Sequence, residues 1–309
     1  MISIISPVYR AEKTLPLLVS EINAVMSRIG EKYEIILVDD RSPDNSWKVM
    51  KDLAENNAHM KIFRLSRNFG QHPAIMAGLS KATGEWIVVM DCDLQDQPKE
   101  IEKLYKKALE GYDLVQAKRK ERKDNVIKRL TSQYFIRTFN YLTDMKVNEE
   151  VANFGIYHRK VINSILNIND YIKAFSLFVN WVGYNRYEIS VEHNERMEGK
   201  SNYSFTKLFS LAFNIIVSFS NKPLKVCVGF GGAISVLSVF VAIFFLIQTL
   251  RGKITEPGYS SLILSIWFLS GAIICCVGIV GLYVGKTFDE VKDRPVYIID
   301  EEIIANSHE

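Results

Sequence analysis

Two long apolar stretches near the C-terminus, residues 226–250 and 257–285, contain no charged side chain. Each is longer than the roughly 20 apolar residues that a helix needs to cross the hydrocarbon core of a bilayer. Glycines recur in both stretches and allow close packing of helices. We therefore expect a two-helix transmembrane domain over residues 224–287, which attaches the rest of the chain to a membrane.

The composition of the chain excludes some functions. The 309 residues carry a net charge of +3, from 38 basic and 35 acidic side chains. A protein whose main task is nucleic-acid binding usually carries a large excess of positive charge, so we expect no nucleic-acid partner. The four cysteines have no spacing typical of a disulfide framework, and we expect no disulfide on a reducing, cytosolic side.

Charges next to the apolar stretches predict the topology. Residues 2–6 are too few, and too soon followed by Pro7, to be a signal peptide, so the first span must direct insertion. More basic residues flank the two spans than lie between them: Lys222, Lys225, Lys286, Lys292 and Arg294 against Arg251 and Lys253. By the positive-inside tendency, we expect a multi-pass protein of the cell membrane with its large domain and both termini in the cytoplasm.

The part of the chain before the spans alternates between strand and helix patterns. Runs of apolar and β-branched residues recur at 2–6, 33–38, 60–65, 86–90 and 114–117. Apolar residues follow helical spacing over 15–29, and Pro43 and Pro98 are placed to open helices. This alternation predicts an α/β domain with a mostly parallel sheet covered by helices on both faces.

Polar side chains gather where the predicted strands end, which is where such sheets bind ligands. Asp91 and Asp93 follow the fourth strand and repel each other unless a cation lies beside them. Oxygen ligands without a His/Cys cluster favour Mg²⁺ or Mn²⁺ on a phosphorylated substrate, with Gln95 as a third ligand. Tyr9 and the Asp39-Asp40 pair end the first two strands.

Residues 204–221 mix aromatic, aliphatic and small polar side chains ahead of Pro223. The pattern favours an amphipathic helix in the membrane interface over residues 204–223, although a core helix of the soluble domain is the alternative. We expect a cytoplasmic catalytic domain over residues 1–203 and a cytoplasmic C-terminal tail over residues 288–309. Residues 294–300 of that tail could add a strand to a neighbouring copy, so we expect a homo-oligomer.

Five ordered motifs run through the chain: SPVYRAE at 6–12, VDDRS at 38–42, SRNFG at 66–70, MDCDLQD at 90–96 and RMEGKSNY at 196–203. Together with the two spans, the chain resembles the family 2 glycosyltransferases of the dolichyl-phosphate mannose synthase and bactoprenol glucosyltransferase type. No single motif is specific, but the ordered set is. The resemblance covers nearly the whole chain and implies a GT-A, Rossmann-like fold.

This resemblance also implies roles for individual residues. The nucleotide-binding set is Pro7, Tyr9, Glu12, Asp39, Asp40, Asn68 and Gly70. The metal-binding set is Asp91, Asp93 and Gln95, which would hold Mg²⁺ or Mn²⁺ on the diphosphate of a sugar donor. Two alternatives stay open from the residues alone: Tyr9 is a packed aromatic, and one of Asp39 and Asp40 only caps a turn.

The acceptor that the family implies is a polyprenyl phosphate, and a membrane anchor suits a lipid that cannot leave the bilayer. Its phosphate needs cationic and hydroxyl partners. The candidates are Arg119, Arg129, Ser132, Arg196, Lys200 and Ser201. Each of them, taken alone, is equally well explained as a plain surface side chain.

Asn153 departs from the family pattern, because several bactoprenol glucosyltransferase relatives have an aspartate there that has been cast as a base. An amide cannot take up a proton. A phosphate monoester with a second pKa of about 6 is largely ionised at neutral pH, however, and needs no general base to attack. We interpret Asn153 as a group that orients a substrate at the catalytic site of Asp91 and Asp93; the alternative is a turn residue.

The sequence therefore predicts an inverting, metal-dependent transfer of one sugar from a nucleotide-diphosphate sugar to undecaprenyl phosphate or a similar lipid. UDP-glucose serves as the example donor, by analogy with the bacterial relatives, and the product would serve cell-surface glycan modification. A processive polysaccharide synthase and a non-catalytic, membrane-tethered nucleotide-sugar-binding protein are the alternatives. The sugar and the polyprenol stay open.

Overall fold

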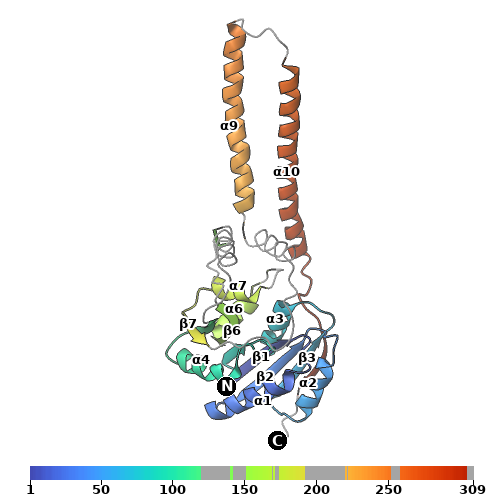
Figure 1. Ribbon diagram of the computed structural model, residues 1–309, viewed down its shortest axis with the longest axis vertical. Helices are drawn as coiled ribbons and strands as arrows, with labels where there is room; N and C mark the ends of the chain where they lie inside the picture. The colour runs from blue at the N-terminus through green and yellow to red at the C-terminus, as the bar shows by residue number, and fades with distance from the viewer. Residues whose placement is uncertain are drawn as a thin grey trace. The chain divides into compact units, whose positions relative to one another are not determined.

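The computed structural model describes residues 1–119, 140–141, 151–168, 170, 174–191, 220, 222–251 and 258–304 (Figure 1). The chain divides into two compact units. The first comprises Met1–Arg137, Met145–Asn202 and Arg294–Glu309. The second comprises Thr138–Asp144 and Tyr203–Asp293. The C-terminal segment that follows the apolar stretches thus belongs to the N-terminal unit.

The first unit is built on an eight-stranded sheet with the order β7-β5-β6-β4-β1-β2-β3-β8. In chain order, the strands are β1 (Ile2–Val8), β2 (Tyr33–Asp39), β3 (Met60–Leu65), β4 (Trp86–Val89), β5 (Leu114–Arg119), β6 (Val151–His158), β7 (Arg186–Val191) and β8 (Ile299–Ile304). The neighbours β4, β1, β2 and β3 are parallel, whereas β6 and β8 run antiparallel to their partners. The predicted mostly parallel sheet is confirmed.

Burial explains the apolar runs from which these strands were predicted. All seven residues of β1 are buried, because the strand lies between two parallel neighbours and under helices on both faces. The five predicted strands correspond to β1 to β5 within two residues at each end. The pattern did not predict β6, β7 or β8.

Helices cover both faces of the sheet. On one face lie α1 (Leu15–Ile29), α2 (Ser46–Glu55) and α4 (Ile101–Ala108), which share one apolar core with β1 and β2. On the other lie α3 (Gln71–Lys81), α6 (Arg159–Leu166) and α7 (Phe175–Trp181). Gly78 lets α3 approach the sheet closely, because a Cβ there would lie 2.5 Å from Cγ2 of Ile5.

The two prolines expected to open helices behave differently. Pro98 begins a 3₁₀ turn, η1 (Pro98–Glu100), that leads directly into α4, so this prediction is confirmed. The prediction for Pro43 is wrong, because α2 begins three residues later, at Ser46. Hydrogen bonds from Ser42 N to Asp39 and from Ser46 to Asp44 hold the intervening residues in a turn.

The second unit contains two long helices, α9 (Lys222–Leu250) and α10 (Tyr259–Val291). Among the described residues, one segment is long and apolar enough to cross a membrane, Ser265–Val291 in α10, with a mean hydropathy of 2.2. A shorter apolar segment, Leu224–Ile234, lies in α9. Large apolar side chains are exposed on both helices, including Phe230 and Trp267. The interfacial helix expected over 204–223 falls outside the described residues except for Ser220 and the start of α9.

The C-terminal strand β8 pairs with β3 of the same chain. The antiparallel register joins Lys61 to Ile304 and Arg64 to Glu301. Residues 288–309 are predicted to form a tail, of which residues 294–300 could add a strand to a neighbouring copy. In the structure, the strand lies a few residues further on and extends the chain's own sheet, because that edge is lined with basic partners for its acidic side chains.

Candidate active site

The predicted site residues come together at one edge of the sheet. Because β4, β1, β2 and β3 are parallel neighbours, their carboxyl ends lie side by side. The residues that follow those ends are Asp91, Tyr9, Asp40 and Asn68, in the spatial order of the strands. Ligands of open α/β sheets bind at this edge.

Hydrogen bonds join the loop after β1 to the loop after β2. The Ser46 hydroxyl accepts a bond of 2.9 Å from the Ala11 amide and donates one to Asp44. The Glu12 carboxylate accepts a bond of 3.0 Å from the Asn45 amide. Glu12, predicted to contact a nucleoside, thus also holds the two loops together. These bonds stabilise the shape of the two loops.

Asp40 caps the loop that leads into α3. Its carboxylate accepts bonds of 2.7 and 2.9 Å from the amides of Phe69 and Gly70, and its side chain is 3% exposed. Burial raises the pKa of Asp40, and the two amides oppose that shift. Asn68 is exposed and donates to the Asp40 carbonyl. Asp40 is therefore a turn cap that positions Asn68 and Gly70.

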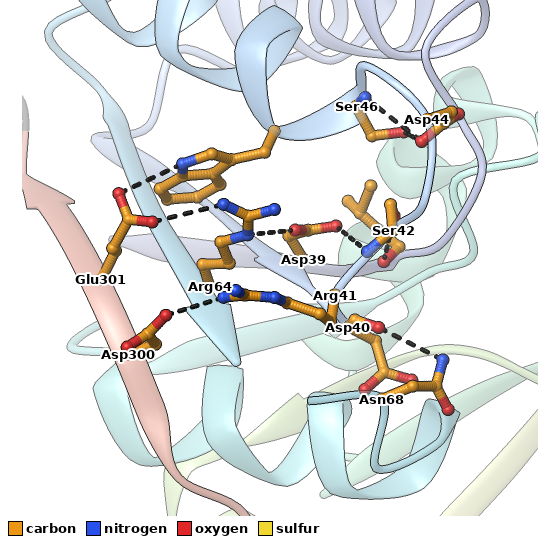
Figure 2. A network of polar contacts seen from close by, with 12 residues as sticks. Asp39, Asp40, Arg41, Ser42, Asp44, Ser46, Arg64, Asn68, Asp300 and Glu301 are labelled. Carbon is orange, nitrogen blue, oxygen red and sulfur yellow. Dashed lines mark hydrogen bonds and ion pairs between the residues drawn. The ribbon is translucent and has the colours of Figure 1, made fainter. Parts of the chain in front are cut away.

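Asp39, which was predicted to contact the nucleotide, is fully buried, with 0% of its surface exposed. One carboxylate oxygen accepts a bond of 3.0 Å from the Ser42 amide, and the other lies 3.2 Å from Nε of Arg64 (Figure 2). Burial raises the pKa of Asp39, whereas Ser42 and Arg64 favour its charged form. Asp39 is thus a buried residue that supports the loop after β2 through its contacts with Ser42 and Arg64.

Tyr9 offers the open aromatic surface in this region. It is 45% exposed, so the alternative of a packed aromatic is wrong. The Arg10 guanidinium lies 5.5 Å from the centre of its ring. Pro7, by contrast, is a buried residue of β1 and pairs with Val38. Its contribution is to the strand rather than to an exposed surface.

The two carboxylates after β4 are half-buried and held by neighbours. Oδ1 of Asp91 accepts a bond of 2.7 Å from the side-chain amide of Gln71, the first residue of α3. Oδ1 of Asp93 accepts a bond of 3.2 Å from the Gln95 amide, which closes a tight turn over Leu94. Both side chains are therefore oriented by the protein itself.

Cys92 separates the two carboxylates and takes no part in their chemistry. Burial raises the pKa of Cys92 to about 12, and Asp91 and Asp93 add to the shift. The thiol stays protonated at neutral pH and is a poor nucleophile and metal ligand. Its backbone carbonyl accepts a bond of 2.8 Å from the Thr14 hydroxyl, which joins the loops after β4 and β1.

Three loops at this edge contain a residue in the left-handed backbone region. These are Arg10 (φ 55°), Arg41 (φ 54°) and Leu94 (φ 59°), in the loops after β1, β2 and β4. Such a conformation costs a non-glycine residue about 1–2 kcal/mol, and it persists only where the surrounding contacts enforce it. Strain of this kind is typical of binding and catalytic sites.

The oxygen atoms at this turn suit a metal ion that is also bound by the substrate. Asp91 and Asp93 supply carboxylate oxygens, and Gln95 adds an amide oxygen at the same turn. Within the described parts of the chain, no group of three or more His, Cys, Asp or Glu side chains forms a complete metal site. Mg²⁺ commonly binds through one or two carboxylates and completes its shell with phosphate oxygens and water. The residues therefore fit a metal that a diphosphate helps to hold.

Asn153 lies on β6, next to β4. The antiparallel register pairs Val89 with Gly155, and its continuation by two residues sets Asn153 level with Asp91. Asn153 is half-buried, and its backbone carbonyl accepts a bond from the Tyr157 hydroxyl. It belongs to a strand, so the alternative of a turn residue is wrong.

The residues predicted to bind the acceptor phosphate fall largely outside the described residues. Arg129, Ser132, Arg196, Lys200 and Ser201 lie there. The backbone of Arg119 ends β5 and pairs with Val191 of β7. The role of these residues in binding the acceptor phosphate stays a prediction.

Sequence reasoning missed three residues that support the site. Gln71 orients Asp91, Arg64 pairs with Asp39, and Glu301 holds Arg64 from β8. Gln71 follows Gly70 directly and could have been suspected as the start of a helix that points at the site. Nothing in the local pattern connects Glu301 with Asp39, because the two are far apart in the chain.

Comparison with known proteins gives consistent results. The model of glycosyl transferase family 2 matches residues 3–166. The chain is 35% identical over 301 residues to an uncharacterized glycosyltransferase of Synechocystis sp., covering 97% of this chain and 95% of that protein. It is 32% identical over 309 residues to the undecaprenyl-phosphate 4-deoxy-4-formamido-L-arabinose transferase of Enterobacter sp., covering 99% and 94%. A glycosyltransferase of Bacillus subtilis is 33% identical, covering 97% and 93%.

Proposed function

The chain belongs to glycosyl transferase family 2 and is a glycosyltransferase with a GT-A fold, and from this premise we propose its substrates. It transfers one sugar from a nucleotide-diphosphate sugar to a polyprenyl phosphate, with undecaprenyl phosphate as the leading acceptor. The observation that carries the proposal is the joint position of the Asp91 and Asp93 carboxylates and the exposed Tyr9 at one sheet edge.

The donor nucleotide binds over the loops after β1, β2 and β3. Tyr9 supplies a ring face for the base, and the exposed Asn68 supplies an amide. Asp39 and Asp40 are buried and stabilise the loops after β2 and β3 through hydrogen bonds with backbone amides. Binding to such a preformed site avoids the entropic cost of ordering the loops.

Asp91, Asp93 and Gln95 would hold Mg²⁺ or Mn²⁺ at the site of the donor diphosphate, and a bound metal would supply positive charge that offsets the charge of the departing nucleotide. Gln71 keeps the Asp91 carboxylate turned in its observed direction. Neither UDP nor GDP is preferred by the chemistry of these residues. UDP-sugars are the first donors to test.

In the reaction, an oxygen of the lipid phosphate attacks the anomeric carbon of the sugar from the face opposite the nucleotide. The new bond forms between that oxygen and the carbon, while the bond from the carbon to the diphosphate breaks and its electron pair leaves with the nucleotide. The configuration is inverted. The attacking phosphate is already ionised, so Asn153 acts by orienting a substrate rather than as a base.

The C-terminal helices bring the enzyme to its lipid substrate. We propose that α9 and α10 both cross the membrane and that the catalytic unit faces the cytoplasm. The uncharged runs at residues 226–250 and 257–285 support two spans. The basic residues that flank the pair support the orientation.

The test is nucleotide release by the purified full-length protein with Mn²⁺ and a panel of UDP- and GDP-sugars, with and without undecaprenyl phosphate. One donor should release its nucleoside diphosphate only when the lipid phosphate is present, and Asp93→Asn should lower that rate by at least about 100-fold. Lipid-independent release would contradict the acceptor assignment. Full turnover by Asp93→Asn would contradict the metal assignment.

A further inference from the structure

A cluster of four side chains connects the C-terminal strand to the loop that forms the nucleotide site. It consists of Asp39 at the end of β2, Trp47 in the first turn of α2, Arg64 on β3 and Glu301 on β8, and we call it the Arg64 cluster. Figure 2 shows Asp39, Arg64 and Glu301 of this cluster. The structure assigns these residues to one unit. A role of this cluster in nucleotide binding rests on the proposed function.

Arg64 is the centre of the cluster and is shared by two carboxylates. Its Nε lies 3.2 Å from Asp39, and its Nη1 lies 3.3 Å from Oε1 of Glu301. The guanidinium also lies 5.5 Å from the centre of the Trp47 ring. A planar guanidinium with several donors can bridge two carboxylates while it stacks on a ring, which a lysine cannot do.

Glu301 completes the arrangement from the other side. Its second oxygen, Oε2, accepts a bond of 3.3 Å from Nε1 of Trp47. One carboxylate therefore holds both Arg64 and Trp47. Asp39 and Trp47 mark the two ends of the loop between β2 and α2, so Glu301 is connected to both ends.

The neighbouring residue of β8 holds the middle of the same loop. Oδ2 of Asp300 lies 2.7 Å from Nη1 of Arg41, which has a left-handed backbone. Consecutive side chains of a regular strand point to opposite faces. Here the register shifts between Arg64 and Leu65, whose partners are Glu301 and Ile299, and the irregularity lets Asp300 and Glu301 face the same loop (Figure 2).

Burial increases from the strand edge to the site. The exposed fraction falls from 45% for Glu301 to 22% for Arg64 and 0% for Asp39. Glu302, the next residue of β8, instead pairs with Lys81 in an exposed contact of 2.9 Å, with exposed fractions of 50% and 38%. Exposed pairs of that kind contribute little, so Glu302 is a matched control on the same strand.

We infer that Glu301 is a positioning residue for nucleotide binding, which acts by holding Arg64 against Asp39 and Trp47 at the start of α2. Without the Glu301 carboxylate, the Arg64 guanidinium is free to turn toward solvent. The loop between β2 and α2 then loses its support at both ends. Because the chemistry occurs at Asp91 and Asp93, this change weakens donor binding and leaves the chemical step almost unaffected.

The experiment compares Glu301→Gln with Glu302→Gln in the full-length protein. Binding of UDP and of GDP with Mn²⁺ is measured by calorimetry, and kcat and KM are measured for the nucleotide sugar that the wild type uses. Glu301→Gln should weaken nucleotide binding and raise KM by roughly three- to tenfold, with kcat within about twofold. Glu302→Gln should change none of these values.

A second variant guards against a folding defect. Arg64→Lys keeps the charge on β3 but cannot bridge Asp39 and Glu301, so it should raise KM in the same way. Thermal unfolding of all three variants shows whether they fold. Equal nucleotide affinity and KM in folded Glu301→Gln, Arg64→Lys and wild type would overturn the inference. Absence of nucleotide binding by the wild type would overturn the proposed function, and the inference with it.

Discussion

Nε2 of Gln71 donates a hydrogen bond of 2.7 Å to Oδ1 of Asp91, and so joins the start of α3 to the end of β4. Asp91 is one of two adjacent carboxylates that would repel each other without a cation. An amide donor on one of its oxygens fixes the side chain in one direction. The direction in which this carboxylate would meet a metal ion is therefore set in part by Gln71.

Removal of this donor should weaken metal binding. We expect Gln71→Ala to raise the Mn²⁺ concentration needed for half-maximal activity by about tenfold, because groups that orient a metal ligand typically contribute that much. Titration of activity with Mn²⁺ measures the change. Asn56→Ala removes an exposed amide at the end of α2 and should leave the Mn²⁺ requirement unchanged. An unchanged requirement in Gln71→Ala would show that Asp91 needs no such support.

Glu34 should make the fold sensitive to acid. Burial would raise the pKa of Glu34, but hydrogen bonds from Lys61, Ser3 and Thr83 outweigh burial and hold the pKa below its usual value. A lowered pKa in the folded state stabilises the protein above the unfolded-state pKa of about 4.3, and this contribution disappears as the pH falls through the folded-state pKa.

Accordingly, Glu34→Gln should lower the free energy of unfolding by about 1–3 kcal/mol at pH 7, and the difference from wild type should shrink below about pH 4. Urea unfolding followed by tryptophan fluorescence at several pH values measures both effects. Glu110→Gln, which breaks an exposed pair with Lys107, is the control and should be neutral. A difference that stays constant down to pH 3 would argue against this role of Glu34.

Gly78 leaves little room for a side chain, because a Cβ there would lie 2.5 Å from Ile5 and 3.3 Å from Val38. Alanine favours the helix by about 1 kcal/mol, but overpacking a buried contact costs about 1–3 kcal/mol. We expect Gly78→Ala to destabilise the protein by about 1 kcal/mol. In an Ile5→Ala background the same change should be neutral or stabilising, and purely additive effects in this double-mutant cycle would contradict the contact.

The two long helices should form a disulfide when oxidised. Cys227 on α9 lies near Cys275 and Cys276 of α10. Oxidation of isolated membranes with copper phenanthroline should therefore give a linked 227–276 peptide, detected by mass spectrometry after proteolysis. Cys276→Ser should abolish this peptide, and Cys275→Ser should not. Linkage through Cys275 instead would mean that α10 presents a different face to α9.

The central strands were predictable because a buried strand appears in the sequence as a run of apolar residues. In β1, Ile2, Ile4, Ile5 and Val8 are fully buried, and the neighbouring strands show the same pattern. β6 was not predicted, because Asn153 and Gly155 interrupt its apolar pattern. Gly155 is required by packing, since a Cβ there would lie 2.8 Å from the Val115 carbonyl. A single sequence does not distinguish such a glycine from one in a turn.

The sequence does not predict that β8 pairs with β3 of the same chain. Asp300, Glu301 and Glu302 find their basic partners 259, 237 and 221 residues earlier in the chain. Pairing over such distances leaves no local pattern. The strand became visible only in the folded sheet.

The location of the site was predictable, but the orientation of its side chains was not. Parallel strands bring their carboxyl ends together, so Tyr9, Asp39 and Asp91 could be grouped from the sequence alone. Whether a carboxylate faces a ligand or the interior depends on contacts such as those of Asp39 with Ser42 and Arg64. Those contacts come from two different strands and a loop.

The most direct test of the central claim is the mass of the lipid product. The full-length protein would be incubated with undecaprenyl phosphate, Mn²⁺ and the nucleotide sugar it consumes, and the lipids would be followed by mass spectrometry over time. We predict one new lipid, heavier than undecaprenyl phosphate by a single sugar residue, and none with Asp93→Asn. A ladder of longer products, or unchanged lipid beside a consumed donor, would contradict transfer of a single sugar to a polyprenyl phosphate.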